Sequence, residues 1–289
     1  MNKLSIFPLR FLIGLLSVLP FWLLYALSDF LCAILFYVFR YRRKVVRQNL
    51  QRAFPEQTAA ERQLIAKKFY HNFCDILLET IKGFSLSESD LRQRYLYRNP
   101  DLIRQQIHKG QSVLLIGSHL TNWEWGVLSV PLRLGKNVTG IYKPLGNPAL
   151  DEYLCDIRRR WGLQLVSMQE CAKLMLRQSS PANAYVFFSD QSPSNTRSAH
   201  WLDFFGQDTA FLPGVDKLAR RTAYPVYWFD IRRVKRGYYE VDFELLEGQA
   251  QHGKEGDVTA RYAQMLEKRI RQRPEDWLWS HKRWKHQRN

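Results

Sequence analysis

Apolar residues follow two spacings along the chain after residue 55. Long stretches repeat an apolar position every three or four residues, as in an amphipathic helix, and short apolar runs bounded by turn formers are typical of strands. The first pattern predicts helices at 59–81, 123–134, 147–160, 170–177, 212–222 and 258–272. The second pattern predicts strands at 113–117, 138–142, 163–166, 185–188, 226–229 and 239–243. Because the two alternate, we expect one α/β domain, 41–289, with a mixed sheet and helices on both faces.

The most hydrophobic stretch lies before this domain, within residues 1–40. Residues 11–28 carry no charge, and ten more uncharged residues, 30–39, follow Asp29. Eighteen helical residues extend about 27 Å and the whole stretch about 43 Å, against ~30 Å of bilayer core, so a tilted span and a shallow re-entrant helix both fit. A secretory signal with Lys3 and Arg10 in its charged region and cleavage after residue 28 is the alternative. Because further apolar residues follow, we expect a retained membrane helix.

Basic residues follow the apolar stretch directly, without an acidic residue between them and Pro55. They are Arg40, Arg42, Arg43, Lys44, Arg47 and Arg52. By the positive-inside rule, this flank and the domain after it lie beside the anionic cytoplasmic leaflet. A solvated basic helix face would account for the same residues.

Composition narrows the possible partners and the possible kinds of site. The 289 residues include 43 Lys and Arg against 27 Asp and Glu, a net charge of +16, and 46% are hydrophobic, which excludes wholesale disorder. Such a chain is attracted to phospholipid, to an acidic carrier protein or to nucleic acid. The four cysteines show no C-x-x-C spacing, which argues against a disulfide scaffold or a zinc site. No nucleic-acid-binding motif is visible, so we expect no nucleic acid partner.

The last 29 residues form a basic, tryptophan-rich segment. Residues 261–289 hold nine positive and three negative charges, with Trp277, Trp279 and Trp284 among them. Aromatic and basic residues together favour a membrane interface or an acyl-carrier surface. We therefore expect this segment to be a docking surface.

Candidate chemistry follows a buried strand in the stretch VLLIGSHLTNWEWG, 113–126. His119 comes two residues after the strand, and Glu124 lies on the first turn of the expected helix. Five helical residues rotate by about 500°, so the two side chains meet only if His119 lies on the turn before the helix. A carboxylate that holds an imidazole in one tautomer makes it a general base.

Two other interpretations of this stretch stay open. Thr121 and Glu124 have the spacing of a capping box, in which Glu124 only satisfies a backbone N–H. Ser118 beside His119 suggests a serine nucleophile, but the G-x-S-x-G elbow is missing.

The histidine, four-residue spacer and acid of HLTNWE resemble the H-x4-D/E motif of the lysophospholipid acyltransferase superfamily. Six further stretches, in the same order, resemble its lipid A biosynthesis branch, the lauroyl/myristoyl acyltransferases. They are RKVVRQNLQRAFPE at 43–56, FYHNFCDILLET at 69–80, YKPLGNPALDEYLCDIRRRWG at 142–162, FFSDQSPS at 187–194, WLDFFGQDTAFLPGVDKLARRTAYPV at 201–226 and EDWLWSHKRWK at 275–285. The similarity covers nearly the whole chain.

This resemblance implies transfer of a fatty acyl chain from a thioester, on acyl carrier protein or coenzyme A, to a hydroxyl of a lipid A precursor or a related anionic lipid. His119 would deprotonate the hydroxyl, and Glu124 would hold His119. The thioester is a co-substrate, so neither a cofactor nor a metal is expected. The family would place the catalytic domain on the cytoplasmic face of the bacterial inner membrane.

The remaining site residues are expected around this pair. Backbone N–H groups near Asn122, or the guanidinium of Arg158, would stabilise the oxyanion. Arg158 and Lys143 are the expected phosphate contacts, and Asp190, after a strand, is expected to reach the same site. An apolar groove for the acyl chain is expected on the helix after Glu124, at Trp123, Trp125, Val127 and Leu128.

Two rival functions belong to other classes. A glycerolipid acyltransferase would use the same His119–Glu124 pair on a lysophosphatidate-like acceptor. A membrane-tethered binding protein would use the basic surface without catalysis. The arginine-rich stretch at 142–162 favours the lipid A branch over the first rival. The lack of a nucleic-acid-binding motif argues against the second, because lipid and a carrier protein explain the basic charge better.

Overall fold

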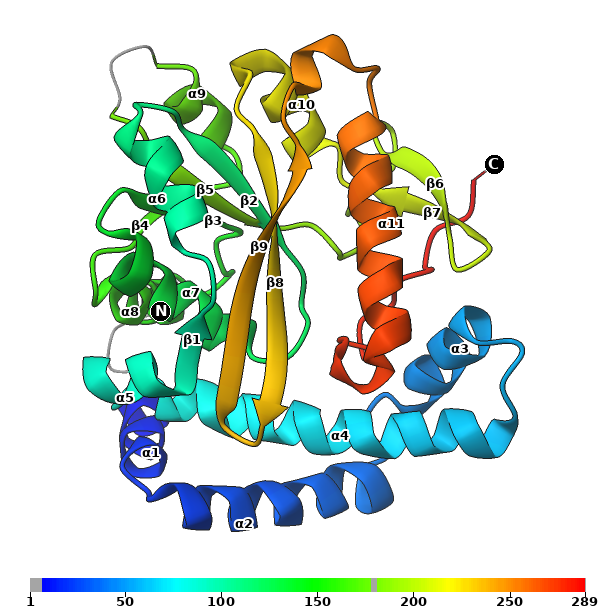
Figure 1. Cartoon of the computed structure of the whole chain (residues 1–289). Helices are drawn as coiled ribbons and strands as arrows, with labels where there is room; N and C mark the ends of the chain where they lie inside the picture. Colours follow the sequence, from blue (N-terminus) through cyan, green and yellow to red (C-terminus); the bar gives the residue numbers. More distant parts are fainter. Residues whose placement is uncertain (1–6, 178–180, 289) are drawn as a thin grey trace.

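The computed structural model describes residues 7–177 and 181–288 of the chain. Seven strands form a mixed sheet in the order β1-β9-β8-β2-β5-β3-β4, in which the β8–β9 pair is antiparallel and the other pairs are parallel (Figure 1). Its strands are β1 (Tyr95–Tyr97), β2 (Val113–Gly117), β3 (Val138–Tyr142), β4 (Gln164–Ser167), β5 (Ala184–Phe188), β8 (Val226–Lys235) and β9 (Tyr238–Glu247). The expected mixed α/β sheet is confirmed.

Alternate residues of the central strands pack into two separate hydrophobic cores, because successive strand side chains point to opposite faces. Leu114 and Ile116 of β2 belong to one core, and Val113 and Leu115 belong to the other. Both faces are therefore covered, as expected for a parallel-rich sheet. The helices of the body are α3 (Arg43–Ala53), α4 (Ala59–Lys82), α5 (Glu88–Arg94), α6 (Asp101–His108), α7 (Trp123–Leu134), α8 (Pro148–Arg159), α9 (Cys171–Met175), α10 (Gly214–Thr222) and α11 (Asp257–Gln272).

Most expected elements agree with the structure to within a few residues, but some segments gave no signal. Strand β1 and helices α5 and α6 lie in the region 83–112, for which no element was expected. The antiparallel hairpin of β6 (His200–Phe204) and β7 (Gln207–Phe211) was missed as well. Its strands contain several polar residues because the hairpin is a separate small sheet, which needs only one face buried.

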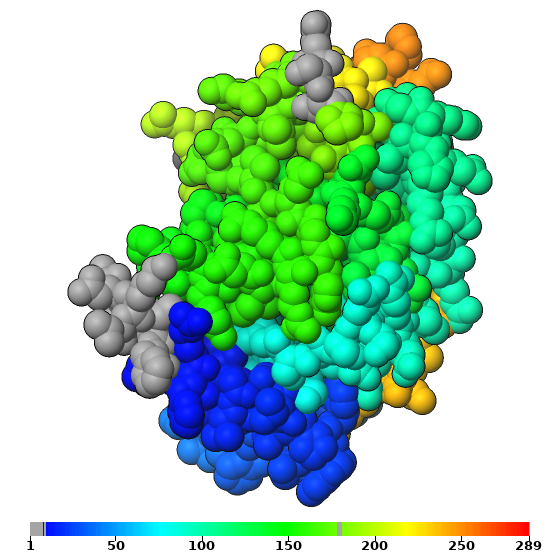
Figure 2. All heavy atoms as spheres, turned by 90° about the vertical axis from the view of Figure 1, so that its left-hand side faces the viewer, coloured from blue at the N-terminus to red at the C-terminus, as the bar shows by residue number. Residues whose placement is uncertain are grey.

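The apolar amino-terminal stretch forms two helices, α1 (Phe7–Ser17) and α2 (Phe21–Ala33), and α2 continues into a π-helical turn, η2 (Ile34–Val38). Pro20 lies at the break, where its ring favours the start of a new helix. By length and composition, 21–38 is long and apolar enough to cross a bilayer. Helix α1 lies below α8 on the face seen in Figure 2, where the Arg10 guanidinium is 4.8 Å from the Tyr153 ring. Lys3 lies outside the described residues.

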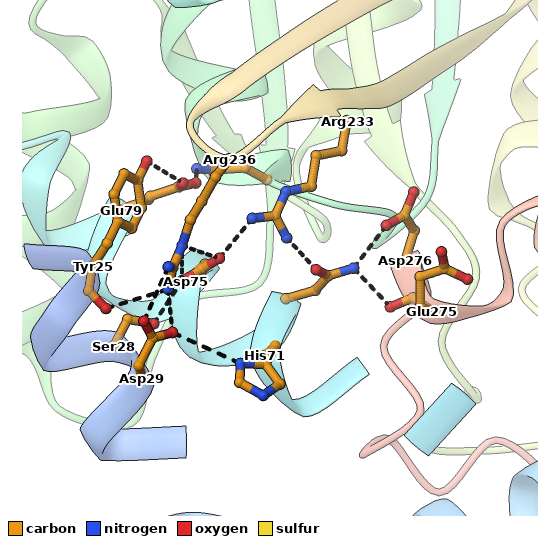
Figure 3. A network of polar contacts seen from close by, with 12 residues as sticks. Tyr25, Ser28, Asp29, His71, Asp75, Glu79, Arg233, Arg236, Glu275 and Asp276 are labelled. Atoms are coloured by element: carbon orange, nitrogen blue, oxygen red, sulfur yellow. Dashed lines mark hydrogen bonds and ion pairs between the residues drawn. The ribbon is translucent and has the colours of Figure 1, made fainter. Parts of the chain in front are cut away.

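A network of polar side chains joins α2 to the body (Figure 3). Asp75 on α4 is buried and accepts hydrogen bonds from Ser28 (2.6 Å), Arg233 (2.6 Å) and Arg236 (2.6 Å). Arg236, at the turn between β8 and β9, also reaches Asp29 of α2 (2.6 Å). These bonds hold α2 along α4, so the amino-terminal segment is packed on the domain along its length.

A second buried carboxylate connects α2 to the start of α7. Glu79 on α4 accepts hydrogen bonds from Tyr25 of α2 (2.9 Å), Tyr239 of β9 (2.6 Å) and Asn122 (2.8 Å). Burial, its largest influence, raises the pKa of Glu79 despite these donors. Asn122 immediately precedes α7, so its hydrogen bond to Glu79 fixes where this helix begins.

Candidate functional site

Three of the expected site residues follow the carboxyl ends of adjacent parallel strands. In the β2–β5 pair, Gly117 lies opposite Phe188, so His119 and Asp190, each two residues further on, leave the sheet side by side. Lys143 follows β3 on the other side of β5 and is exposed. Ligands of open α/β sheets bind at this edge, which makes it the candidate active site.

Close packing at the end of β2 explains the glycine there. A Cβ atom on Gly117 would lie 3.1 Å from the ring of Phe188, closer than side chains normally approach. The Phe188 ring also lies against the imidazole of His119, with ring centroids 5.5 Å apart. The imidazole also meets the Trp123 ring edge to face at 4.9 Å. The two aromatic side chains therefore fix the plane of the imidazole.

Asp190 is the carboxylate that holds His119. The distance from His119 Nδ1 to Asp190 Oδ1 is 2.6 Å, and the backbone N–H of His119 donates to Asp190 Oδ2 (2.9 Å). Trp277 Nε1 donates to the same Oδ2 (2.9 Å). Burial alone would raise the pKa of Asp190, but the charge of His119 and these three donors together lower it. Asp190 is therefore an ionised acceptor.

An ionised Asp190 fixes the tautomer of neutral His119. Because the carboxylate can only accept, Nδ1 carries the proton and Nε2 keeps its lone pair. The side-chain nitrogen of Gln191 lies 3.3 Å from Nε2, as an amide donor to that lone pair would. Burial lowers the pKa of His119, yet the charge and hydrogen bond of Asp190 and the charge of Glu124 outweigh it, and the pKa is raised. In this arrangement, Nε2 can accept a proton from a nearby hydroxyl group.

The expectation that Glu124 holds His119 is corrected by the structure. His119 lies on the turn before α7, as the spacing required, but the Glu124 carboxylate is directed to Arg158 in the last turn of α8. Arg158 Nη2 donates to both carboxylate oxygens (2.9 and 3.1 Å) and Nε donates to one of them (3.3 Å). Glu124 therefore acts on His119 through its charge alone, and Arg158 reaches the site as half of an ion pair.

The capping-box interpretation of Thr121 and Glu124 is wrong. The residue that caps α7 is Asn122, whose side-chain oxygen accepts from the backbone N–H of Trp125 (2.9 Å). Thr121 instead adopts the left-handed region, with φ 53°, in the turn that follows His119. Asn122 is fully buried and its amide nitrogen donates to Glu79, so its side chain is structural and does not reach a substrate.

The carboxyl-terminal segment packs against the site, which corrects the expectation that its tryptophans belong to a docking surface. Trp277, Trp279 and Trp284 are all buried in the core that contains Leu114 and Ile116 of β2. Thr121 donates from its backbone N–H to the carbonyl of Asp276 (2.9 Å), which ties the His119 turn to this segment. The tryptophans are thus packing residues, and Trp277 also orients Asp190.

Two more residues of this segment hold the loop after Asp190. His281 Nε2 accepts from the backbone N–H of Ser192 (2.9 Å), and burial, its main cause, lowers the pKa of His281 to about 4. Arg283 is buried and donates to Ser192 Oγ (3.4 Å) and to the carbonyl of Ala210 in β7 (2.8 Å), and burial lowers its pKa to about 10. Neither role follows from residue type or spacing. The only sequence feature that singled out these two residues was the family-like stretch EDWLWSHKRWK, which does not reveal what their side chains contact.

The expected acyl groove divides between the two sides of α7. Trp125 is fully buried, donates to the carbonyl of Glu79 (2.7 Å) and packs on Tyr239, and Leu128 is buried as well. These two residues belong to the core. Trp123 and Val127, one helical turn apart, are only half-buried and share the side of α7 next to His119. Gln191, which contacts His119, was not expected at all, because it gave no signal beyond its place after Asp190.

Comparison with known proteins assigns this chain to a family. A profile of the bacterial lipid A biosynthesis acyltransferases matches residues 5–286. The chain is 24% identical over 234 residues to a lipid A biosynthesis acyltransferase of Haemophilus influenzae, covering 80% of this chain and 73% of the relative. It is 22% identical over 269 residues to the lipid A biosynthesis lauroyltransferase of Escherichia coli, covering 92% and 87%. The chain therefore belongs to the bacterial lipid A biosynthesis acyltransferase family and is an acyltransferase.

Proposed function

We propose that this enzyme transfers a fatty acyl chain from an acyl thioester to a hydroxyl of a lipid A precursor, with His119 as the general base. The observation that carries the mechanism is the His119–Asp190 pair, which leaves the Nε2 lone pair directed away from the carboxylate. The relatives named as lauroyl, palmitoleoyl and myristoyl transferases of lipid A biosynthesis support the choice of acceptor.

In the proposed step, Nε2 of His119 takes the proton of the acceptor hydroxyl while the oxygen attacks the thioester carbonyl. A new C–O bond forms, the carbonyl oxygen becomes an oxyanion, and the intermediate then breaks its C–S bond. The leaving thiolate takes the proton from the imidazolium, which restores neutral His119. Asp190 stabilises the imidazolium during this cycle. Because Asp190 is buried, its attraction to the charged His119 is stronger than it would be in water.

Arg158 and Lys143 are the cations that we assign to the negative groups of the substrates. Arg158 is half-buried, and its contacts with Glu124 use Nε and Nη2, which leaves Nη1 for a carbonyl oxygen or a phosphate. Lys143 is exposed at the end of β3 and suits a phosphate further from the reacting atoms. Glu124 holds the guanidinium in a fixed plane, so its proposed role is to orient Arg158 and to raise the basicity of His119.

We assign the donor to an acyl chain on acyl carrier protein or coenzyme A, both of which carry the chain as a thioester on a phosphopantetheine arm. We also propose that the reaction takes place at the cytoplasmic face of the bacterial inner membrane, and the amino-terminal apolar helices support this location. A net charge of +16 favours both an acidic carrier and an anionic membrane.

An assay of the purified full-length enzyme tests this proposal. It uses a lipid A precursor with a free hydroxyl, each donor in turn, and product mass as the readout. We expect one acyl chain to be added, with loss of the thioester, and His119→Ala to lose it. Acyl transfer to lysophosphatidate but not to the lipid A precursor would contradict the acceptor. Full activity of His119→Ala would contradict the mechanism.

A further inference from the structure

The basic stretch after the apolar helices, residues 40–52, has two faces with different surroundings. On one face, Arg42 and Arg52 donate to the carbonyls of Ser280 (2.9 Å) and Trp284 (2.9 Å), and Asn49 donates to that of Trp279 (2.8 Å). These three side chains hold the carboxyl-terminal segment, which packs against the candidate active site. Contacts within the fold therefore explain the polar and basic residues on this side of α3.

The other face lines a cavity of about 760 Å³ between η2, α3 and the first half of α4. Five basic residues line this basic cavity, and its lining, which lies within the described residues, holds no Asp or Glu. They are Arg40, Arg43, Lys44, Arg47 and Arg62. Below them, Phe36, Val46, Leu50 and Tyr70 form an apolar floor. A charged rim over an apolar floor matches an amphipathic ligand with an anionic group.

Two of the five cations are fixed in place, and three have no partner. The Arg43 guanidinium lies 4.7 Å from the Phe36 ring, and Arg62 donates to the carbonyl of Phe54 (3.0 Å). Within the part of the chain that the structure describes, the side chains of Arg40, Lys44 and Arg47 make no hydrogen bond or ion pair. Like charges gathered around one cavity repel each other, so an anion between them would be stabilised.

The position of the basic cavity indicates where that anion comes from. The cavity adjoins the end of the apolar segment, where Tyr37, Val38 and Phe39 are 64%, 69% and 72% exposed. Apolar side chains this exposed, directly before a cluster of cations, are typical of a chain entering the headgroup layer. A phosphate at the headgroup level and a hydrocarbon chain below it would reach the rim and the floor together.

We propose that the basic cavity binds the headgroup of an anionic phospholipid of the membrane, at a site separate from the catalytic centre. Its ligand is a phosphodiester with attached acyl chains, held by Arg40, Lys44 and Arg47 and oriented by Arg43 and Arg62. Bound lipid would press α3 against the carboxyl-terminal segment, and hence support the loop that carries Asp190. The site does not depend on the identity of the transferred acyl chain or of the acceptor.

Native mass spectrometry of the full chain in neutral detergent, titrated with dimyristoyl phosphatidylglycerol or dimyristoyl phosphatidylcholine, tests this site. We expect retention of one phosphatidylglycerol, bound at least about tenfold more tightly than phosphatidylcholine. Arg40→Gln/Lys44→Gln/Arg47→Gln should weaken phosphatidylglycerol binding by about one hundredfold, since each juxtamembrane cation contributes separately.

Two further variants separate local binding from net charge and from misfolding. Lys217→Gln/Arg220→Gln/Arg221→Gln removes the same charge from α10, at the opposite end of the molecule (Figure 1), and should bind as the wild type does. Ala66→Leu narrows the cavity while keeping all five cations, and should weaken binding with an unchanged melting temperature.

Three results would overturn the proposal. The first is wild-type affinity for phosphatidylglycerol in both the triple cavity variant and Ala66→Leu. The second is inorganic phosphate binding as tightly as the lipid, which would make the cavity a free-phosphate site. The third is loss of acyl carrier protein binding in the triple cavity variant with lipid retention intact, which would make it a protein-docking site.

Discussion

The imidazole of His119 is influenced by two carboxylates in different ways. Asp190 accepts hydrogen bonds from Nδ1 and from the backbone N–H of His119, and Glu124 acts from further away through its charge. A contact selects a tautomer, whereas a distant charge only shifts an equilibrium. Substitutions of the two acids should therefore differ in kind.

Asp190→Asn should lose most acyl transfer, because a neutral amide neither fixes the Nδ1–H tautomer nor stabilises the imidazolium. We expect kcat to fall by about 10² to 10⁴ in Asp190→Asn and in His119→Ala, a typical range for a positioned general base. The double variant should be scarcely worse than either single variant, because the two residues act as one unit. Turnover measured beside the melting temperature separates this from unfolding. Additive losses in the double variant would show that the two residues act independently.

The pH dependence of kcat should report the raised pKa of His119. His119 is active when neutral, so activity should rise with pH, with its midpoint above 6.5, the ordinary histidine value. Glu124 is one of the causes that raise this pKa, so Glu124→Gln should move the midpoint to lower pH, besides lowering the maximum through loss of the Arg158 contact. Glu88→Gln, which removes an exposed carboxylate on α5, should leave the midpoint unchanged. A midpoint that stays fixed in Glu124→Gln would contradict Coulombic coupling.

At the scale of elements, α7 has two sides that should respond differently to substitution. Val127 lies one helical turn from Trp123 on the half-buried side, and Leu128 lies in the core. A bulky side chain on the first side fills space that the acyl chain would occupy.

Val127→Trp should shift the preferred donor to shorter acyl chains with little loss of stability. Leu128→Ala, as the matched change on the core side, should lower stability by about 2–5 kcal/mol and leave the chain preference unchanged. Competition between C10 to C16 donors, read by product mass, measures both variants. An unchanged preference in Val127→Trp would place the acyl groove on another element.

The junction of α2, α4 and the β8–β9 turn depends on the buried Asp75. Asp75→Asn leaves Arg233 and Arg236 without their shared carboxylate, and breaking a buried pair from one side costs about 3–5 kcal/mol. Glu244→Gln, which removes an exposed ion pair with Arg269, should cost no more than about 1 kcal/mol. Denaturant unfolding in detergent compares them. Equal effects of the two substitutions would show that the network in Figure 3 contributes nothing specific.

For the whole molecule, the amino-terminal segment is part of the folded body. Ser28 donates to Asp75 and Tyr25 donates to Glu79, so cleavage after residue 28 would leave both buried carboxylates short of a donor. A retained amino-terminal segment would therefore hold the body at the membrane.

We predict that the mature membrane-bound protein keeps residues 1–28 and that its body faces the cytoplasm, because the basic flank follows the apolar helices. Intact mass of the membrane fraction should equal that of the full chain. The body should resist added protease in intact spheroplasts and be degraded once the membrane is permeabilised. A mass lacking 1–28, or digestion in intact spheroplasts, would contradict the prediction.

Local pattern was sufficient for much of the fold. The runs at 113–117 and 138–142 became β2 and β3, and the apolar period at 123–134 became α7, because strand and helix periods depend on neighbouring residues. The strand-turn-helix context also placed His119 on the turn before α7. The polar β6 and β7 and the short β1 could not be predicted in the same way, because they form only against partners distant in sequence.

The sequence by itself determined the family and the alternating α/β architecture and made His119 the candidate base, since these inferences depend on short motifs and on periodicity. Only the tertiary structure decided which acid holds His119. Asp190 is 71 residues away along the chain, and the parallel register of β2 and β5 brings it alongside. Likewise, the tryptophans of the carboxyl-terminal segment match a surface in composition, but α3 and the sheet enclose them. Pairings between distant segments follow from sheet register and packing, which a local pattern does not encode.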